Sequence, residues 1–536
     1  MSARGSRRGR PAQRPGRGRS APPRSARDAV ELLLREELER RRGFPPALEK
    51  EARRAARAAS GSSAPRRDLV EMPTFTVDPA TARDFDDAVS ARREGDGTRL
   101  WIHIADVAAH VKPGSPLDRE ARRRANSTYA PGTVEPMLPK VLSAGACSLS
   151  PGVERLAVTA EIVLGAGGKV VETSFYRSRI RSDVRLDYDQ LDEIFAGRAE
   201  APAEVAEPLA IARSAAAVLA EAKAGTGLDV ESSEPEFEFD RGGEVVAARS
   251  VPQTEAHRLI ERLMILTNEA VARLLEQRRV PAIYRIHPQP DPERVERLVA
   301  QLHDLEVPTP ALRAGISPRE AAAVVVEASG LVRKEAERRG HGRAAYTSLV
   351  LRSLQQAQYS DRNNGHAGLG SSAYCHFTSP IRRYADLVVH RALLATLGEG
   401  EKAPRAGEAR DVAVRCSERE RESMQIERRA DDICAAFLLQ RELGRSGGRR
   451  EPVFEGEVSG TIRSGAFIAF GGKLGDVYEG FLPARRLPED FFELNESETA
   501  LVGRRTGRTI RLGDPISVRV GGVEAPRGRV DLEPAA

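Results

Sequence analysis

The sequence contains no long apolar run. Its hydrophobic fraction is 40%, and no stretch reaches the roughly 18 uninterrupted apolar residues that crossing a bilayer requires. The N-terminus is basic, but no apolar segment of the kind found in secretory signals follows it. We therefore expect a soluble protein that stays in the cytoplasm and does not bind membranes.

Cysteines are few and far apart in the chain. There are four, and none is part of a CxxC pair: Cys147, Cys375, Cys416 and Cys434. The disulfide frameworks of small secreted domains and structural zinc sites both rely on closely spaced cysteines. The spacing therefore argues against both kinds of site, and we expect reduced thiols.

A general excess of positive charge is also missing from most of the chain. The formal net charge is +5, but residues 1–27 contain nine Arg and no acidic residue, so the rest of the chain carries −4. A basic tail attracts polyanions over about a Debye length, yet it can equally serve only solubility. Net charge leaves both alternatives open, so function has to be inferred from motifs.

Composition divides the chain into segments, and its length suits about two to four domains. Residues 1–27, rich in Arg, Pro, Gly and Ser, are predicted to be a disordered tail. Residues 28–65 follow with helical apolar spacing and an SGSSAP linker, which indicates a small helical segment. A long body is predicted at residues 66–443. Short apolar runs indicate strands in its first part, and long helical patterns dominate from about residue 202 onward.

A different pattern follows the GRSGGRR linker at residues 444–450. Residues 452–534 contain short apolar runs, among them GAFIAF and ISVRV, separated by Gly-containing turns. Short strands of this kind are typical of a small β-barrel. The predicted fold class is therefore α+β, with a mixed body followed by a small all-β barrel. No internal repeat of solenoid period is present.

Four carboxylates lie within ten residues in the segment TVDPATARDFDDA, at Asp78, Asp84, Asp86 and Asp87. They follow a predicted strand, and gathering like charges in one loop costs free energy unless cations neutralise them. Mg²⁺ suits such a loop, because a few carboxylates hold it and leave positions for water and a substrate phosphate. The alternatives are a solvated acidic loop or a Ca²⁺ loop. The segment lacks the Gly and Glu of an EF-hand, and Phe85 indicates packing against a core.

A second motif, YCHFTSPIRRYADL, begins at Tyr374. It places the adjacent guanidiniums of Arg382 and Arg383 after a proline turn, with the hydroxyl of Ser379 close by. Such a group can hold a phosphate and stabilise the charge that builds on its oxygens during phosphoryl transfer. Alone, the motif could equally be a helix start with a surface Arg pair. Combined with the aspartates, it supplies what metal-assisted phosphodiester hydrolysis requires.

The segments DPATARDFDDA and HFTSPIRRYADL together resemble the two signature motifs of the RNB exoribonuclease family, the ribonuclease II and ribonuclease R type. Other segments, including WIHIADVAAHVKPGSPLDREA and EAHRLIERLMILTNEA, resemble family segments in the same order. The resemblance covers about residues 66–440 and implies an RNB catalytic domain. Residues 452–534, with GEVSGTIRSGAFIAF, resemble the S1 RNA-binding domain, an OB-type barrel.

The resemblance implies roles for the motif residues. Asp78, Asp84 and Asp87 would hold Mg²⁺ directly or through water. Asp86 would also belong to the metal site and would matter most for the chemical step. Arg382 would stabilise the pentavalent phosphate, and Arg383 would contact the RNA backbone.

Further RNA contacts are expected outside the two motifs. Tyr129 matches an aromatic residue that stacks near the 3′-terminal nucleotide, although it could be a core tyrosine. Glu261 matches an acidic residue near the RNA end, although it could be a helix-surface charge. Ser379 is expected to contact RNA, and Phe467 to be an exposed stacking residue of the barrel. Phe470 could face either the surface or the core of the barrel, and His103 and Asp106 are interpreted as structural.

The function implied by the resemblance is a hydrolytic, processive 3′-to-5′ exoribonuclease that releases 5′-nucleoside monophosphates from single-stranded RNA in RNA turnover. Two Mg²⁺ ions would take part, with Mn²⁺ as an alternative, and the protein is expected to be monomeric. Two other functions stay open: a catalytically inactive RNA-binding regulator on the same scaffold, and a metal-dependent endonuclease.

The N-terminal part departs from the family pattern. Bacterial relatives usually have two cold-shock-type OB domains before the RNB domain, whereas residues 1–65 here read as a tail and helices. The departure concerns the part of the chain that would anchor RNA. The Arg-rich tail and the small helical segment are candidates to replace those domains.

Overall fold

The structure is a computed structural model that describes residues 23–38, 42–60, 65–228, 233–445, 452–471, 477–488 and 490–535. Most of the predicted tail at 1–27 and of the predicted linker at 444–450 lies outside the described residues. All four cysteines are buried and free, as expected. Among the helices of these described ranges, none combines the length and the apolar character that a bilayer crossing needs.

A seven-stranded sheet forms the centre of the larger part of the molecule, with the strand order β1-β8-β7-β4-β3-β2-β9. Its strands are β1 (Arg67–Asp68), β2 (Phe75–Val77), β3 (Asp87–Glu94), β4 (Gly97–Ala105), β7 (Glu154–Leu164), β8 (Val170–Arg181) and β9 (Val184–Leu186). Strands β3, β4, β7 and β8 pair in antiparallel fashion, but β9 pairs with β2 in parallel. The residues that follow β2 and β9 therefore meet at one edge of the sheet.

Helices cover this sheet. Helix α6 packs against β3 and β4, and α7 packs against β4. The helices of this part are α3 (Val107–His110), α4 (Pro116–Arg124), α5 (Tyr188–Phe195), α6 (Ala206–Ala222), α7 (Glu255–Gln277) and α11 (Tyr384–Thr396). In α11, every residue from Tyr384 to Leu394 is buried. Its Asp, His and Arg side chains therefore need partners inside the protein.

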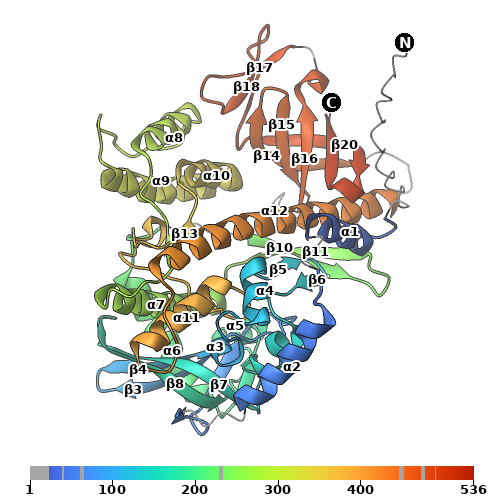
Figure 1. Ribbon diagram of the computed structural model, residues 1–536. Helices are drawn as coiled ribbons and strands as arrows, with labels where there is room; N and C mark the ends of the chain where they lie inside the picture. Colours follow the sequence, from blue (N-terminus) through green and yellow to red (C-terminus); the bar gives the residue numbers. More distant parts are fainter. Residues whose placement is uncertain are drawn as a thin grey trace, which may run out of the picture.

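The 40-residue helix α12 (Ala406–Arg445) lies between the two parts of the molecule. Figure 1 shows the sheet and its helices on one side of α12 and the C-terminal barrel on the other. The barrel is closed, in the order β14-β15-β16-β21-β20. Its strands are β14 (Val453–Ile462), β15 (Gly465–Phe470), β16 (Tyr478–Pro483), β20 (Pro515–Glu524) and β21 (Arg529–Pro534), and the strands of a small sheet beside it are β17 (Phe492–Leu494), β18 (Ala500–Gly503) and β19 (Thr509–Arg511). The predicted fold class is confirmed.

Helices make up most of residues 202 to 440, where helical sequence patterns dominate, but strands are also present. This region contains two short antiparallel strand pairs, β10 (Ser233–Phe239) with β11 (Val245–Pro252), and β12 (Tyr284–Ile286) with β13 (Gln358–Ser360). It also contains the helices α8 (Pro292–Asp304), α9 (Pro318–Arg339) and α10 (Arg343–Ser353). These three helices form their own core, to which Leu512, between β19 and β20, contributes.

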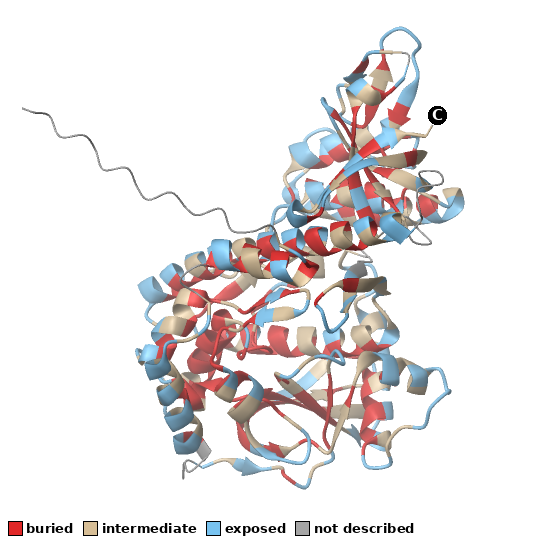
Figure 2. Cartoon of the chain, turned by 90° about the vertical axis from the view of Figure 1, so that its right-hand side faces the viewer, coloured by how far each residue is buried: buried red, intermediate tan, exposed pale blue. Residues whose placement is uncertain are grey.

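The two N-terminal helices predicted from the sequence are present, and they join different cores. Helix α1 (Ala26–Leu38) packs against α12 and shares a core with the barrel. Helix α2 (Pro46–Ser60) places Ala52 in the core that surrounds the seven-stranded sheet. Buried residues fill both the sheet region and the barrel (Figure 2). Apolar spacing predicts a buried helix face but does not show which core covers it.

Candidate active site

The aspartate motif forms the connection between β2 and β3. The chain leaves the sheet after Val77 and returns at Asp87, and neighbouring segments hold the loop in place. The amide of Asp78 donates to the carbonyl of Leu186 at 3.3 Å, and the amide of Phe85 donates to Ser148 Oγ at 3.0 Å. The side chain of Phe85 is buried in the core. This excludes a freely solvated acidic loop.

The arginine motif forms the turn that leads into α11. Asp386, in the first turn of the helix, is fully buried. Its carboxylate accepts from the amide of Ser379 at 2.8 Å and from Arg383 Nε and Nη2 at 2.9 and 2.8 Å. These bonds stabilise one shape of the turn and leave Arg382 half-exposed at its surface, with 46% of the side chain accessible.

The two motifs meet in space. The amide of Ile381 donates to Asp86 Oδ1 at 2.8 Å, across 295 positions of sequence. Arg382 Nε lies 3.7 Å from Asp86 Oδ2, and Arg382 Nη2 donates to Ser379 Oγ at 3.1 Å. A guanidinium and a cluster of carboxylates therefore lie side by side, as the hypothesis of a joint site required.

The charges of the aspartates are not fully compensated by the protein. Burial raises the pKa of Asp86 well above its ordinary value, although Arg382 opposes the shift. Burial and the neighbouring carboxylates of Asp87 and Asp84 raise the pKa of Asp78, and burial raises that of Asp87 against the effect of Arg382. Raised carboxyl pKa values of this origin mean that burial and like-charge repulsion oppose the charged form of these aspartates, which a bound cation would favour.

The donor set fits Mg²⁺. Two carboxylate oxygens, Asp78 Oδ2 and Asp86 Oδ2, are buried and have no hydrogen-bond donor, and such atoms need a cation or a proton. Among the described residues, no three His, Cys, Asp or Glu side chains converge closely enough to hold a metal ion by themselves. Mg²⁺ does not require such a cage, because it commonly binds one or two carboxylates together with waters and substrate phosphates.

Tyr129 lies beside the aspartates. It is in β5 (Thr128–Ala130), which forms a small hairpin with β6 (Thr133–Glu135). Its hydroxyl donates to Asp84 Oδ2 at 3.0 Å, and its amide donates to Glu427 Oε1 of α12 at 2.7 Å. With an exposed fraction of 38%, Tyr129 is not the core tyrosine that the sequence left open.

Tyr188 is a site residue that the sequence reasoning missed. It stacks on His257 of α7 with a ring distance of 3.9 Å. Its pKa is raised by burial and, to a smaller extent, by the carboxylates of Asp87 and Asp78. Tyr188 follows β9 as Asp78 follows β2, so only the parallel pairing of these strands brings the two residues together.

Glu261 lies one turn after His257 on α7. It is exposed, and its Oε2 accepts from Gln253 Nε2 at 2.7 Å. Its partner is thus a residue close by in the chain, and its role toward RNA stays a prediction.

Ser379 and Arg383 both have structural contacts in this conformation. Ser379 is buried, and its hydroxyl accepts from Arg382, so it orients that guanidinium. Arg383 makes its two bonds to Asp386 with only 21% of its side chain exposed. Contacts of either residue with RNA stay predictions.

In the barrel, the aromatic residues separate as strand alternation requires. Phe470 is fully buried and Tyr478 is buried. Phe467 is half-buried and packs against Phe481 at a ring distance of 5.3 Å. Of the three, Phe467 is the one whose ring is accessible for stacking, but that role also stays a prediction.

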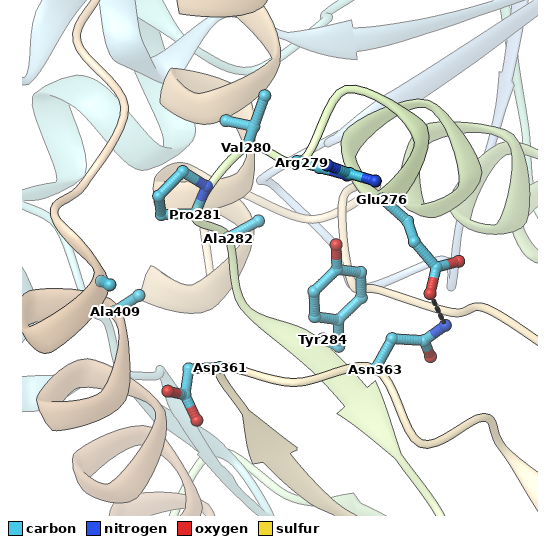
Figure 3. Close-up of a pocket in the computed structure, with 10 residues that line it drawn as sticks. Glu276, Arg279, Val280, Pro281, Ala282, Tyr284, Asp361, Asn363 and Ala409 are labelled. Carbon is cyan, nitrogen blue, oxygen red and sulfur yellow. Dashed lines mark hydrogen bonds between the residues drawn. The ribbon is translucent and has the colours of Figure 1, made fainter.

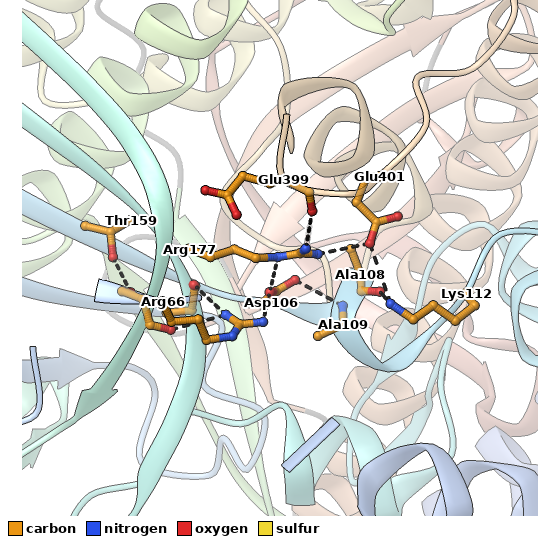
Figure 4. A network of polar contacts seen from close by, with 11 residues as sticks. Arg66, Asp106, Ala108, Ala109, Lys112, Thr159, Arg177, Glu399 and Glu401 are labelled. Carbon is orange, nitrogen blue, oxygen red and sulfur yellow. Dashed lines mark hydrogen bonds and ion pairs between the residues drawn. The ribbon is translucent and has the colours of Figure 1, made fainter. Parts of the chain in front are cut away.

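Asp106 and His103 are structural, as expected. The fully buried Asp106 caps α3 through Ala109 and accepts from Arg66 at 2.7 Å and Arg177 at 2.9 Å. Arg177 also reaches Glu401, so the network in Figure 4 joins the sheet to the segment after α11. His103 is fully buried between Ser90 Oγ and Thr159 Oγ1.

We expect Asp106→Ala to lower the free energy of unfolding by about 3–5 kcal/mol, because Arg66 and Arg177 would lose their buried partner. Burial opposes the charge of Asp106, but Arg177 and Arg66 outweigh it and lower its pKa. The carboxylate therefore stabilises the fold above pH ~4 and stops doing so as the pH falls through its lower folded pKa. Thermal denaturation monitored by circular dichroism checks this, with Glu172→Ala on the exposed face of β8 as the control. Equal midpoints for the two variants would contradict it.

A pocket of about 310 Å³ lies away from the aspartates. Figure 3 shows it between the end of α7, β12 and the start of α12, with Glu276, Arg279, Tyr284 and Asp361 on its walls. None of the site residues predicted from the sequence lines it. The aspartates, Arg382 and Tyr129 therefore form the candidate site on geometry and charge.

The RNB domain model matches residues 66–399, and the chain belongs to the RNB family. Ribonuclease R of Escherichia coli strain K12 is 34% identical over 488 residues, 88% of this chain and 57% of that protein. Ribonuclease R of Thermotoga maritima is 34% identical over 523 residues, 94% of this chain and 70% of that protein. The structure of Mycoplasma genitalium RNase R in complex with ribose methylated single-stranded RNA has a TM-score of 0.85 at 25% identity, covering 96% of this chain and 78% of that one. The chain thus spans little more than half the length of the E. coli relative.

Proposed function

We propose that this protein is a hydrolytic, processive 3′-to-5′ exoribonuclease that releases 5′-nucleoside monophosphates from single-stranded RNA in RNA turnover. The observation that carries the proposal is the contact between the two motifs, in which Asp86 accepts from the Ile381 amide and faces Arg382. Membership of the RNB family and similarity to ribonuclease R support it.

The proposed chemistry assigns each part of the site a task. Asp78, Asp84, Asp86 and Asp87 would hold Mg²⁺, which supplies water activation and charge neutralisation at the phosphate. Mn²⁺ is an alternative ion. Arg382, held by Ser379 and facing the carboxylates, would donate to the phosphate oxygens on which charge builds. Arg383, paired with Asp386, would keep the turn in shape and contact the RNA backbone.

The proposed RNA contacts lie around this centre. Tyr129 offers its ring for the 3′-terminal base, because every base has a face that can stack. Glu261, on the α7 edge of the site, would lie near the RNA end, and Phe467 would stack a base at the barrel. The M. genitalium relative was solved with single-stranded RNA, which supports the same class of ligand. For its oligomeric state and location, the proposal is a monomer in the cytoplasm.

Purified protein with 5′-labelled single-stranded RNA, with and without Mg²⁺, tests the proposal. We expect progressive shortening only with Mg²⁺, release of nucleoside monophosphates, and no cleavage of circular RNA. Binding without shortening would favour a catalytically inactive RNA-binding regulator. Cleavage of circular RNA would show an endonuclease, since a circle has no 3′ end.

A further inference from the structure

The segment between α1 and α2 contacts the hairpin that carries Tyr129. Arg42 Nε lies 2.5 Å from Glu135 Oε1, and the amide of Gly43 donates to Glu135 Oε2 at 3.3 Å. Arg42 Nη1 also binds Glu31 Oε2 of α1 at 2.7 Å. One carboxylate at the end of β6 therefore receives two donors from the N-terminal segment, which precedes the part matched by the RNB domain model.

Arg124 strengthens the same contact from the body. Its Nη2 donates to the carbonyl of Gly43, and its Nη1 donates to the carbonyl of Pro136, next to Glu135, at 3.0 Å. Its guanidinium also lies over the ring of Phe44, 3.9 Å from the centroid. The segment 42–44 is thus held against both the hairpin and the end of α4.

The opposite edge of the hairpin is held by α12. Thr128 Oγ1 and Asn126 Nδ2 bond to Ser423 Oγ at 2.9 and 2.7 Å, and the amide of Tyr129 bonds to Glu427. Glu135 lies directly opposite Thr128, the residue before Tyr129. A hairpin of two three-residue strands is not stable by itself in water. Its position therefore depends on these two sets of anchors.

We propose that Arg42 and Glu135 are positioning residues that hold the Tyr129 ring where it meets the 3′-terminal base. The inference rests on the proposed function, because it concerns how that RNA end is received. Glu135 is buried, with 10% of its side chain exposed, and that of Arg42 is 23% exposed. Loss of either charge would break the ion pair between these two side chains, which would leave Arg42 with Glu31 alone or Glu135 with the Gly43 amide alone, and the hairpin would shift. Misplacement by about 1 Å at an active site can lower the rate by about 10²-fold.

The test uses full-length Glu135→Gln and Arg42→Gln, with Arg54→Gln as the control. Arg54 is exposed on α2 and its replacement removes the same charge. For Glu135→Gln and Arg42→Gln we expect kcat to fall by about 10-fold to about 100-fold, with KM for long RNA unchanged and the protein folded at the assay temperature. Arg54→Gln should behave as wild type.

A second readout does not require hydrolysis. RNA with 2-aminopurine as its 3′-terminal base, bound to the protein in EDTA, reports stacking through fluorescence quenching. We expect weaker quenching with Glu135→Gln than with wild type, at equal affinity. If wild type quenches the base but degrades no RNA, the proposed function fails and the positioning inference stands. Equal quenching by wild type and both single variants, or no quenching by wild type, overturns the inference. If Glu135→Gln does not fold, Arg42→Lys replaces it in the quenching experiment. A lysine keeps the positive charge but cannot bond to Glu31 and Glu135 as the guanidinium does, so we expect weaker quenching than with wild type, and equal quenching overturns the inference.

Discussion

Asp86→Asn is expected to bind RNA as wild type does but to lose at least about 10²- to 10³-fold in kcat. The amide keeps the shape of the side chain and an oxygen that accepts from Ile381, so the turn before α11 should stay in place. What disappears is the negative charge of the buried, donor-free Oδ2 that faces Arg382. Fluorescence anisotropy measures binding, and gel electrophoresis of 5′-labelled poly(A) measures hydrolysis.

The matched control for this variant is Asp189→Asn. Asp189 is exposed on α5, and its contact with Arg249 is a surface pair at 3.5 Å, which should contribute little. A protein with Asn at position 86 that still shortens poly(A) at the rate of the control would refute the role of Asp86. Equal loss of binding and hydrolysis would indicate a role in RNA binding instead.

Arg382→Ala is expected to lower kcat by about 10²- to 10³-fold with a small effect on KM, because the guanidinium would act where charge develops on the phosphate. Arg382→Lys should recover part of the rate, since a lysine keeps the charge but not the planar fork of donors. Steady-state kinetics on single-stranded RNA provides both constants. A rise in KM at constant kcat would show that Arg382 only binds the substrate.

Arg383→Ala supplies the contrast to Arg382→Ala. Arg383 is bonded twice to the fully buried Asp386, so its removal leaves a buried carboxylate with a single donor, the Ser379 amide. The expected result is a loss of about 3–5 kcal/mol of stability, visible as a lower thermal midpoint. Arg382 is half-exposed, and its Nε lies 3.7 Å from Asp86 Oδ2. Arg382→Ala should therefore leave the thermal midpoint nearly unchanged.

Local patterns in the sequence predicted much of this molecule. The loop position of the aspartates follows from apolar runs on both sides of a proline turn, and the burial of Phe85 was predicted from its place within the charges. The barrel was predicted from short strands between Gly turns. These features depend on residues near each other in the chain, where periodicity and turn chemistry are informative.

The sequence distinguished less well between the roles of the two adjacent arginines of the second motif. Arg382 and Arg383 are adjacent, and their residue type is the same. What distinguishes them is the direction of each side chain at the start of α11: one reaches Asp386 three positions later, and the other faces a carboxylate 296 positions earlier. Likewise, no pattern around Tyr188 indicated a site, because its neighbours there come from the parallel pairing of β9 with β2.

The sequence by itself determined the residue types of the site, the fold class and the separate strand-rich C-terminal part, since these follow from local chemistry and spacing. Only the tertiary structure decided which of these groups meet: Asp86 with Ile381 and Arg382, Tyr129 with Asp84, and Arg42 with Glu135. The physical reason is that such contacts join segments far apart in the chain. They form only when burial of the shared cores brings those segments together.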